Sequence, residues 1–172
     1  KDIPAEAILF DMYYMAKDPV ALAGEKRELP KVELKPVDET TPQFRNFHIS
    51  NVYCNGAEKG IFVRGIPEMH VKDIVLENMV LQADKGIDIQ EASGISLKNI
   101  KIISKETNPV IDIIQSDKLQ FDNISYSDGS ELLFRISGDR SNGIRIKNTD
   151  ATKAKQSIVY ELGATEKAVT RE

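Results

Sequence analysis

The sequence predicts an all-β fold, a right-handed single-stranded parallel β-helix of about five to six coils. The first observation is an asparagine that recurs two residues after an apolar residue, with gaps of 27, 21, 24 and 25 residues. The second is a strand-like segment after each of the first four asparagines, and the third is the lack of a helical half-repeat. A period of this length indicates coils that stack on one another. The recurring residues are Asn51, Asn78, Asn99, Asn123 and Asn148.

The strand-like segments follow the asparagines by about ten residues. Apolar residues, mostly isoleucine, valine and phenylalanine, alternate with others there, as half-buried strands require. Turn-forming residues separate the pieces, including Gly60, Gly86, Gly94 and the pairs Asn108-Pro109 and Asp128-Gly129. Each strand should therefore pair with its equivalent one coil away, at about 4.8 Å. The segments are 61–64, 87–90, 111–114 and 134–137.

The asparagines have a structural interpretation. An asparagine amide both donates and accepts hydrogen bonds, so a stack of them can satisfy the backbone at a bend and each other. Backbone groups that point inward at the bend would be their partners. Asn123-Ile124-Ser125 is a glycosylation sequon, but we expect Asn123, as a member of the ladder, to be buried. Leucine-rich repeats share the period, but their asparagine lies three residues after a fixed leucine, so we exclude that fold.

The whole chain, 1–172, is interpreted as the C-terminal part of one β-helix domain. Residues 7–15 resemble a second strand piece whose asparagine-bearing partner is absent. A coil cut open there would expose strand edges. We therefore expect truncation on the N-terminal side, with upstream coils of the same protein as a partner.

Three regions follow along the chain. Residues 16–43 form an inserted loop, with Val32-Glu33-Leu34 as a candidate edge strand, and loops of this length tend to be functional or to cover a surface. Residues 44–148 are the regular coils. Residues 149–172 form a terminal coil and cap, with a strand at 157–162 and a short helix that Thr165 would cap. The loop contains four of the seven prolines, which are Pro19, Pro30, Pro36 and Pro42.

Composition excludes several functions. The net charge is −4, the isoelectric point is about 5.3 and basic residues are scattered, so nucleic-acid binding is not indicated. No apolar run approaches 18 residues, so no membrane span is expected. The single cysteine, Cys54, is expected to be a small core residue or a turn residue. His48 and His70 lack partners at metal-ligand spacing, so we expect neither a metal nor a cofactor.

A charged column is predicted on the second strand pieces. If these strands align, Asp88, Asp112 and Arg135 share one outward position on neighbouring coils. Carboxylates about 5 Å apart can shift one pKa and perform acid–base chemistry. The arginine beside them would neutralise the charge, so a solvated charge ladder is the favoured interpretation.

Several coils resemble a known family. The runs 44–52 (FRNFHISNV), 59–68 (KGIFVRGIPE) and 74–78 (IVLEN) are similar to the C-terminal coils of bacterial glycoside hydrolase family 28, the polygalacturonase-like pectin hydrolases. The opening run 7–15 (AILFDMYYM) is similar to the coil after that family's catalytic centre. The resemblance implies a pectin-lyase-like β-helix and covers nearly the whole chain.

The resemblance implies inverting hydrolysis, which needs an acid and a base carboxyl about 6.5–9.5 Å apart. The family's Asp-Asp and Gly-His-Gly motifs are absent, so no catalytic residue is assigned. Arg145-Ile146-Lys147 and Asn148-Thr149-Asp150 spell two family motifs, but they abut in reversed order and are interpreted as coincidence. The family's substrate-contacting tyrosine matches Tyr13 or Tyr14; the sequence does not choose between them, and an ordinary aromatic residue at a strand end is the alternative.

The leading hypothesis is therefore a segment of a pectin hydrolase that acts on galacturonan or rhamnogalacturonan. Its catalytic aspartates would lie upstream, the segment alone would be inactive, and the parent protein would be secreted or periplasmic. A calcium-dependent lyase is disfavoured because no suitable aspartate cluster is evident. The alternative hypothesis is a non-catalytic β-helix, either a carbohydrate-binding or an adhesin-like module.

Overall fold

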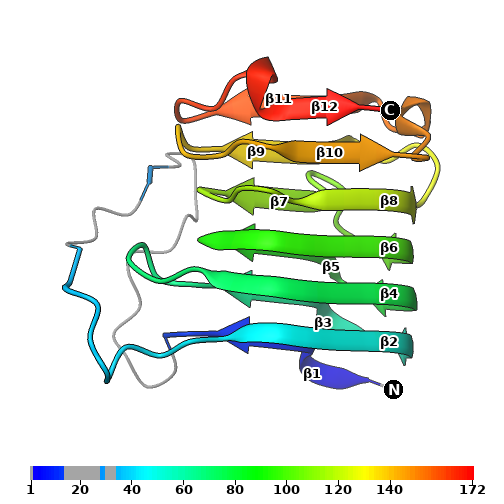
Figure 1. Cartoon of the computed structure of the whole chain (residues 1–172). Coiled ribbons are helices and arrows are strands. Elements are labelled where there is room, and N and C mark those ends of the chain that lie inside the picture. Colours follow the sequence, from blue (N-terminus) through cyan, green and yellow to red (C-terminus); the bar gives the residue numbers. More distant parts are fainter. Residues whose placement is uncertain (1, 14–27, 30–33) are drawn as a thin grey trace.

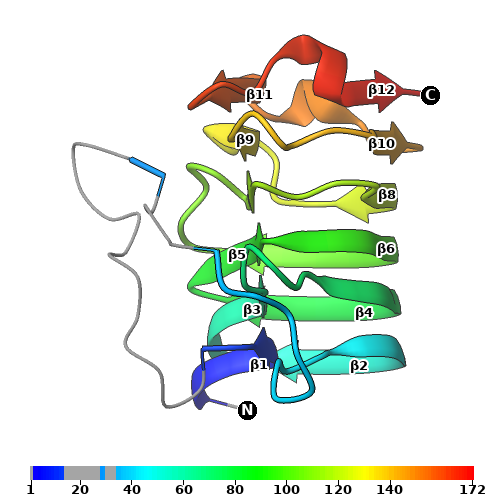
Figure 2. The same cartoon turned by 60° about the vertical axis from the view of Figure 1, so that its left-hand side comes forward.

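A computed structural model describes residues 2–13, 28–29 and 34–172. They form a nearly all-β stack of about five turns, which confirms the predicted parallel β-helix (Figure 1). Nearly every coil contributes one strand to each of two six-stranded sheets, and every pairing within the sheets is parallel (Figure 2). None of the described helices is long and apolar enough to cross a membrane.

Sheet A contains the second strand pieces in the order β1-β3-β5-β7-β9-β11. Its strands are β1 (Ile3–Asp11), β3 (Ala57–Arg64), β5 (Lys85–Gln90), β7 (Ile111–Ile114), β9 (Leu132–Ser137) and β11 (Gln156–Glu161). The strands β3, β5 and β9 begin before the predicted segments and are longer, and β7 has the predicted bounds. The first and last strands, β1 and β11, have the predicted lengths but begin earlier in the chain.

Sheet B has the order β12-β10-β8-β6-β4-β2. The strands are β2 (Arg45–Asn55), β4 (Val71–Ala83), β6 (Ala92–Ser104), β8 (Gln120–Ser125), β10 (Ile144–Lys147) and β12 (Val169–Arg171). The strands β2, β4 and β6 contain the bend asparagines Asn51, Asn78 and Asn99 and continue beyond them, so these three strands are the longest in the molecule.

The core is a set of inward columns between the sheets. Ile61, Ile87 and Ile111 pair in successive strands of sheet A and are at most 1% exposed. Leu76 and Leu97 form the matching column of sheet B and are fully buried. Alternation along each strand therefore places its apolar residues inside, as the sequence pattern requires. Cys54 is buried in this core, as expected.

The predicted burial of the asparagines is wrong. All five are exposed, and each has a positive φ of 48–60°. Asparagine tolerates that left-handed conformation better than most residues do. The amides do bond to each other: Asn99 Nδ2 donates to Asn78 Oδ1, and Asn123 Nδ2 donates to Asn99 Oδ1, both at 2.9 Å.

The asparagine ladder ends before both ends of the stack. Asn148 Nδ2 donates to Asp122 Oδ1 at 2.7 Å instead, and Asn51 Nδ2 donates to Ser50 Oγ at 3.3 Å. The sequon residue Asn123 is thus exposed, while its amide is engaged in the ladder.

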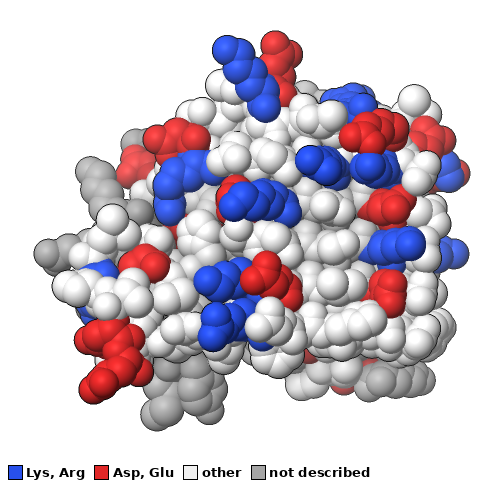
Figure 3. Space-filling view, in the orientation of Figure 1, with Lys and Arg blue, Asp and Glu red and all other residues white. Residues whose placement is uncertain are grey.

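A column of alternating charge runs along the outer face of sheet B, beside the asparagines. Glu77, Lys98, Asp122 and Lys147 occupy one register position on successive strands, and Lys147 Nζ lies 2.5 Å from Glu172 Oε2. Acidic and basic residues alternate along this face of the stack (Figure 3). This order places opposite charges opposite each other across strands, which is the favourable pairing.

The two ends of the chain differ from the prediction in detail. The first strand ends at Asp11 rather than running to residue 15, and residues 14 and 15 lie outside the described residues, as do Val32 and Glu33. The strand near 157–162 is confirmed as β11. The expected helix is a single 3₁₀ turn, η2 (Glu166–Ala168), and the Thr165 side chain makes no capping bond.

Candidate functional site

Tyr13 follows β1, and its surroundings are organised by Asp11. The Tyr13 backbone N–H donates to Asp11 Oδ1 at 3.0 Å. The same carboxylate receives two bonds from Arg64 on β3, from Nε at 2.9 Å and from Nη2 at 2.6 Å. Such a two-point contact fixes the guanidinium plane. Arg64 Cζ consequently lies 4.9 Å from the centre of the Tyr13 ring, at cation–π distance.

A second aromatic ring, that of Phe62, lies on β3, the strand that also carries Arg64. Phe62 occupies the outward register position between Leu9 and Asp88. Arg64 Cζ is 5.2 Å from its ring centre and Lys59 Nζ is 4.3 Å from it, while Lys59 also pairs with Asp88. We call Tyr13, Phe62, Arg64 and Lys59 the aromatic platform. It consists of two rings on the outer face of sheet A and two cations packed against them, and both cations are mostly buried and paired with carboxylates.

A groove of about 460 Å³ adjoins the platform. Tyr13, Met12, Ile66 and Glu68 line one side, and the segment 35–42 lines the other through Lys35, Pro36, Asp38, Thr40, Thr41 and Pro42. The described part of the inserted loop runs beside the first coils (Figure 2). The loop therefore contributes a wall to a surface hollow, as its length suggested.

Asp38 organises the loop wall. Its Oδ1 accepts from the Thr40 backbone N–H at 2.8 Å and from Thr40 Oγ1 at 2.7 Å, and the Asp38 N–H donates to Thr41 Oγ1 at 3.0 Å. These hydrogen bonds, led by that from the Thr40 side chain, lower the pKa of Asp38. The groove therefore has a stable negative charge on this wall at neutral pH.

Glu68 supplies the opposite wall. It lies on a tight reversal closed by two backbone bonds between Ile66 and Met69, at 3.1 and 3.0 Å. Its Oε2 is buried and accepts no hydrogen bond from the residues that the structure describes. A buried carboxylate oxygen without a donor is unfavourable. This oxygen has almost no accessible surface, so Glu68 lines the groove with the rest of its side chain.

The Tyr13 hydroxyl is held in its neutral form. Burial raises the pKa of Tyr13, and the nearby negative charges of Glu68 and Glu91 raise it further. A neutral phenol both donates and accepts hydrogen bonds. Tyr13 can therefore offer the groove a ring face and a hydroxyl at physiological pH.

Glu91 is already engaged by other residues. Its Oε1 accepts from Arg140 Nη2 at 2.6 Å, and its Oε2 lies 3.2 Å from His70 Nε2. His70 Nδ1 is in turn 4.0 Å from Asp117 Oδ1. This cluster joins residues of four successive coils, so we assign it a structural role.

The predicted column of Asp88, Asp112 and Arg135 is confirmed by the strand register. Arg135 contacts Asp112 at 3.8 Å and Glu161 at 3.7 Å, and its Nη2 donates to Asn108 Oδ1 at 3.0 Å. The Asp112 and Arg135 side chains are only 15% and 16% exposed, so the ladder is less solvated than expected. Asp88 is paired with Lys59 and Asp112 with Arg135, so we assign the column a structural role.

The two motif-like triplets near the C-terminus have structural roles. Lys147 pairs with Glu172, and Asn148 is the last bend asparagine. Asp150 caps the 3₁₀ turn η1 (Ala151–Lys153): its Oδ1 accepts from the Thr152 N–H at 3.0 Å and from Thr152 Oγ1 at 2.6 Å. These bonds lower the pKa of Asp150.

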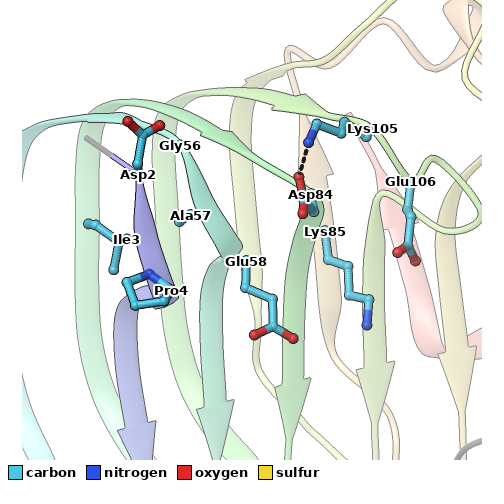
Figure 4. A pocket seen from close by; sticks show the side chains of 10 residues that line it. All are labelled: Asp2, Ile3, Pro4, Gly56, Ala57, Glu58, Asp84, Lys85, Lys105 and Glu106. Carbon is cyan, nitrogen blue, oxygen red and sulfur yellow. Dashed lines mark ion pairs between the residues drawn. The ribbon is translucent and has the colours of Figure 1, made fainter.

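A second hollow, of about 550 Å³, lies at the opposite ends of the sheet A strands. Glu58, Lys85 and Glu106 extend in one direction from successive coils there, and Lys105 pairs with Asp84 at 2.5 Å (Figure 4). Opposite charges alternate there and none of its described lining residues is aromatic, so we favour the Tyr13 groove as the candidate site. Asp2, Ile3, Pro4, Gly56 and Ala57 complete its lining.

The sequence singled out Tyr13 and missed its partners. Phe62 could have been recognised, because it is an aromatic residue at an outward position of a predicted strand, aligned with Asp88 on the next coil. Glu68 could not, because its role depends on the reversal at 66–69. Tyr14 lies outside the described residues. Within residues 2–13, 28–29 and 34–172, no three histidine, cysteine or acidic side chains gather as metal ligands would.

Comparison of the chain with protein-family models, curated proteins and solved structures finds no match. The structure therefore defines the class, a parallel β-solenoid with an aromatic and charged hollow on one sheet. The groove beside Tyr13 is the feature of this solenoid that bears on function.

Proposed function

We propose that this chain is the substrate-holding part of a polygalacturonase-like glycoside hydrolase of family 28, which cleaves pectin-type polysaccharide with inversion. The observation that carries the proposal is the aromatic platform, in which Tyr13 and Phe62 both lie against Arg64 beside the groove. Ring faces suit the apolar faces of sugars, and fixed polar groups around them suit hydroxyls and carboxylates.

The proposal assigns catalysis to polypeptide outside these 172 residues. Inversion needs two carboxyl groups across a gap that admits water. The carboxylates Asp11, Asp88 and Asp112 are each paired with a cation. The proposed parent enzyme acts outside the cytoplasm, because its substrate is an extracellular polymer.

Binding is tested by calorimetric titration with oligogalacturonides and with rhamnogalacturonan oligosaccharides. Tyr13→Ala and Phe62→Ala should each weaken binding by about twofold to tenfold, since aromatic contacts contribute about 0.5–1.5 kcal/mol beyond area burial. Tyr53→Ala is the matched control, because Tyr53 is 73% exposed on sheet B, away from the platform. Absence of binding, or equal loss in the control, would refute the proposal.

Reducing-end release distinguishes this proposal from a chain that is itself a complete hydrolase. The 172-residue chain should release no reducing ends from polygalacturonate, and Asp150→Asn should change neither this result nor binding. Hydrolysis that Asp150→Asn abolishes would show that the C-terminal triplets are catalytic after all.

The non-catalytic carbohydrate-binding module remains a second candidate, because the platform and groove are built entirely from this chain. The two candidates would separate in an assay of any longer natural protein that contains this chain. Hydrolysis by that protein, lost on Tyr13→Ala, supports the enzyme; binding without hydrolysis supports the module.

A further inference from the structure

The outer face of sheet B places opposite charges in register, with one exception. Glu77, Lys98 and Asp122 lie in register on successive strands, so each charge faces an opposite one (Figure 3). Arg45 on β2, in contrast, lies in direct register with Lys72 on β4. Within the part of the chain that the structure describes, this is the one pair of like charges in register in sheet B. Like charges that face each other across two strands are destabilising.

No carboxylate of the described residues neutralises this pair. Neither Arg45 nor Lys72 forms an ion pair or a side-chain hydrogen bond with residues 2–13, 28–29 or 34–172. Asp73 follows Lys72 in the chain, but its Oδ1 lies against the next coil, where a Cβ on Gly94 would be 3.0 Å away. Arg45 is exposed and Lys72 is partly exposed, so both side chains are accessible to a dissolved anion.

The two cations stand on strands that are joined where the pair lies. The Lys72 backbone N–H donates to the Phe44 carbonyl oxygen at 3.0 Å. Adjacent strands of a sheet are about 4.8 Å apart. One tetrahedral oxyanion between the two side chains can therefore accept a charge-assisted hydrogen bond from each of them.

The charge of the pair favours one class of anion. A phosphate group carries about −1.5 to −2 charges at neutral pH and matches two cations, whereas one carboxylate leaves a positive charge unmatched. The whole protein has a net charge of −4, so its overall field does not attract anions and the attraction is local to this pair. Departures from an otherwise consistent pattern are expected at functional sites.

We propose that Arg45 and Lys72 form a binding site for a phosphate group on the outer face of sheet B. The group is either inorganic phosphate or a phosphate monoester, because both present the same charged oxygens. The site is separate from the aromatic platform on sheet A, so this inference does not depend on the proposed function.

NMR titration at low ionic strength tests the site with inorganic phosphate, glucose 6-phosphate and acetate. The amide signals of Arg45 and Lys72 should shift saturably, and phosphate should bind at least about threefold more tightly than acetate. Lys72→Gln and Arg45→Gln should each weaken phosphate binding about threefold to fivefold, because one of two exposed charge contacts is lost. Lys101→Gln is the matched control and should leave binding unchanged, since Lys101 is a lysine between Val80 and Ser125 on the same sheet.

Thermal unfolding separates binding from folding. Because the two cations repel each other, Lys72→Gln should not lower the unfolding temperature without phosphate. Phosphate should raise the unfolding temperature of the wild-type chain more than that of Lys72→Gln, since a ligand stabilises the folded state that binds it.

Three results would overturn the site: no saturable shift at Arg45 and Lys72, equal affinity for acetate and phosphate, or equal effects of Lys72→Gln and Lys101→Gln. Tighter binding of glucose 6-phosphate than of inorganic phosphate identifies a monoester as the ligand, and equal or weaker binding identifies the free ion. Both of these orders support the site. Oligogalacturonide binding tests the proposed function separately, so either proposal can fail alone.

Discussion

The central coils and the first coil follow the same residue pattern but differ in burial. Ile74 on β4 and Ile95 on β6 are at most 1% exposed, whereas Phe47, at the same register position on β2, is 42% exposed. The reason is position: β4 and β6 have a paired strand on both sides, while β2 is at the edge of sheet B.

The repeat pattern therefore specifies which side chains point inward, and the neighbouring coils shield those side chains from solvent. A coil buries its apolar face only against the coils above and below it. The largest energetic effects are therefore expected in the middle of the stack. The proposed binding surface, in contrast, belongs to the first two coils.

The largest effect is expected for core truncation. Ile95→Ala should lower the free energy of unfolding by about 2–5 kcal/mol, because it leaves a cavity in a fully packed column. Ile49→Ala on β2 is the matched substitution; it should cost about 1–2 kcal/mol, because Ile49 is only partly buried. Urea denaturation measures both. Equal losses would mean that the first coil is as well packed as the centre.

The next effect concerns the bend asparagines. Asn99→Ala should destabilise by about 1–3 kcal/mol, since alanine disfavours a φ of 54° and the bonds to Asn78 and Asn123 are lost. Asn99→Gly relieves the backbone strain and isolates the hydrogen bonds. Asn51→Ala should cost less, because Asn51 bonds only its neighbour Ser50 among the described residues. Similar losses at both positions would show that the ladder itself contributes little.

A smaller effect is expected at Tyr126, whose hydroxyl donates to the Asp150 carbonyl at 2.7 Å. Tyr126→Phe should lower stability by about 0.5–1.5 kcal/mol at neutral pH. Burial raises the pKa of Tyr126, so its contribution is complete below about pH 10 and is lost as the pH rises through the raised value. Between pH 9 and 12 the free energy of unfolding of Tyr126→Phe should therefore fall less than that of the wild type. Tyr53→Phe controls for removal of an exposed hydroxyl, and an unchanged pH profile in Tyr126→Phe would contradict the assignment.

The smallest effect is expected in the charge column of sheet B. Lys98→Gln should cost about 0.2–1 kcal/mol, because Lys98 lies between Glu77 and Asp122 on an exposed face. The difference should shrink in 1 M salt, where charges are screened. Lys101→Gln, at a position flanked by Val80 and Ser125, is the control and should change little. A loss that is independent of salt would indicate packing of the lysine stem instead.

The sequence by itself determined the period, the alternation and hence the stacking. These are local properties: a strand with period-two apolar residues has only one face to bury, and equal spacing brings equivalent residues into register. For this reason the column of Asp88, Asp112 and Arg135 was predicted correctly. The exposure of the bend asparagines was not predicted correctly. Their left-handed φ cannot be derived from the repeat pattern, and the path of the backbone at the bend depends on it.

Which side chains contact each other at the candidate site depends on the tertiary structure. Asp11 and Arg64 are 53 residues apart in sequence, yet their contact places Arg64 between Tyr13 and Phe62. The orphaned oxygen of Glu68 depends on how the 66–69 reversal faces Tyr13 and the loop. Periodicity fixes which residues share a column, but contacts between turns, loops and strand ends depend on loop paths that no repeat specifies.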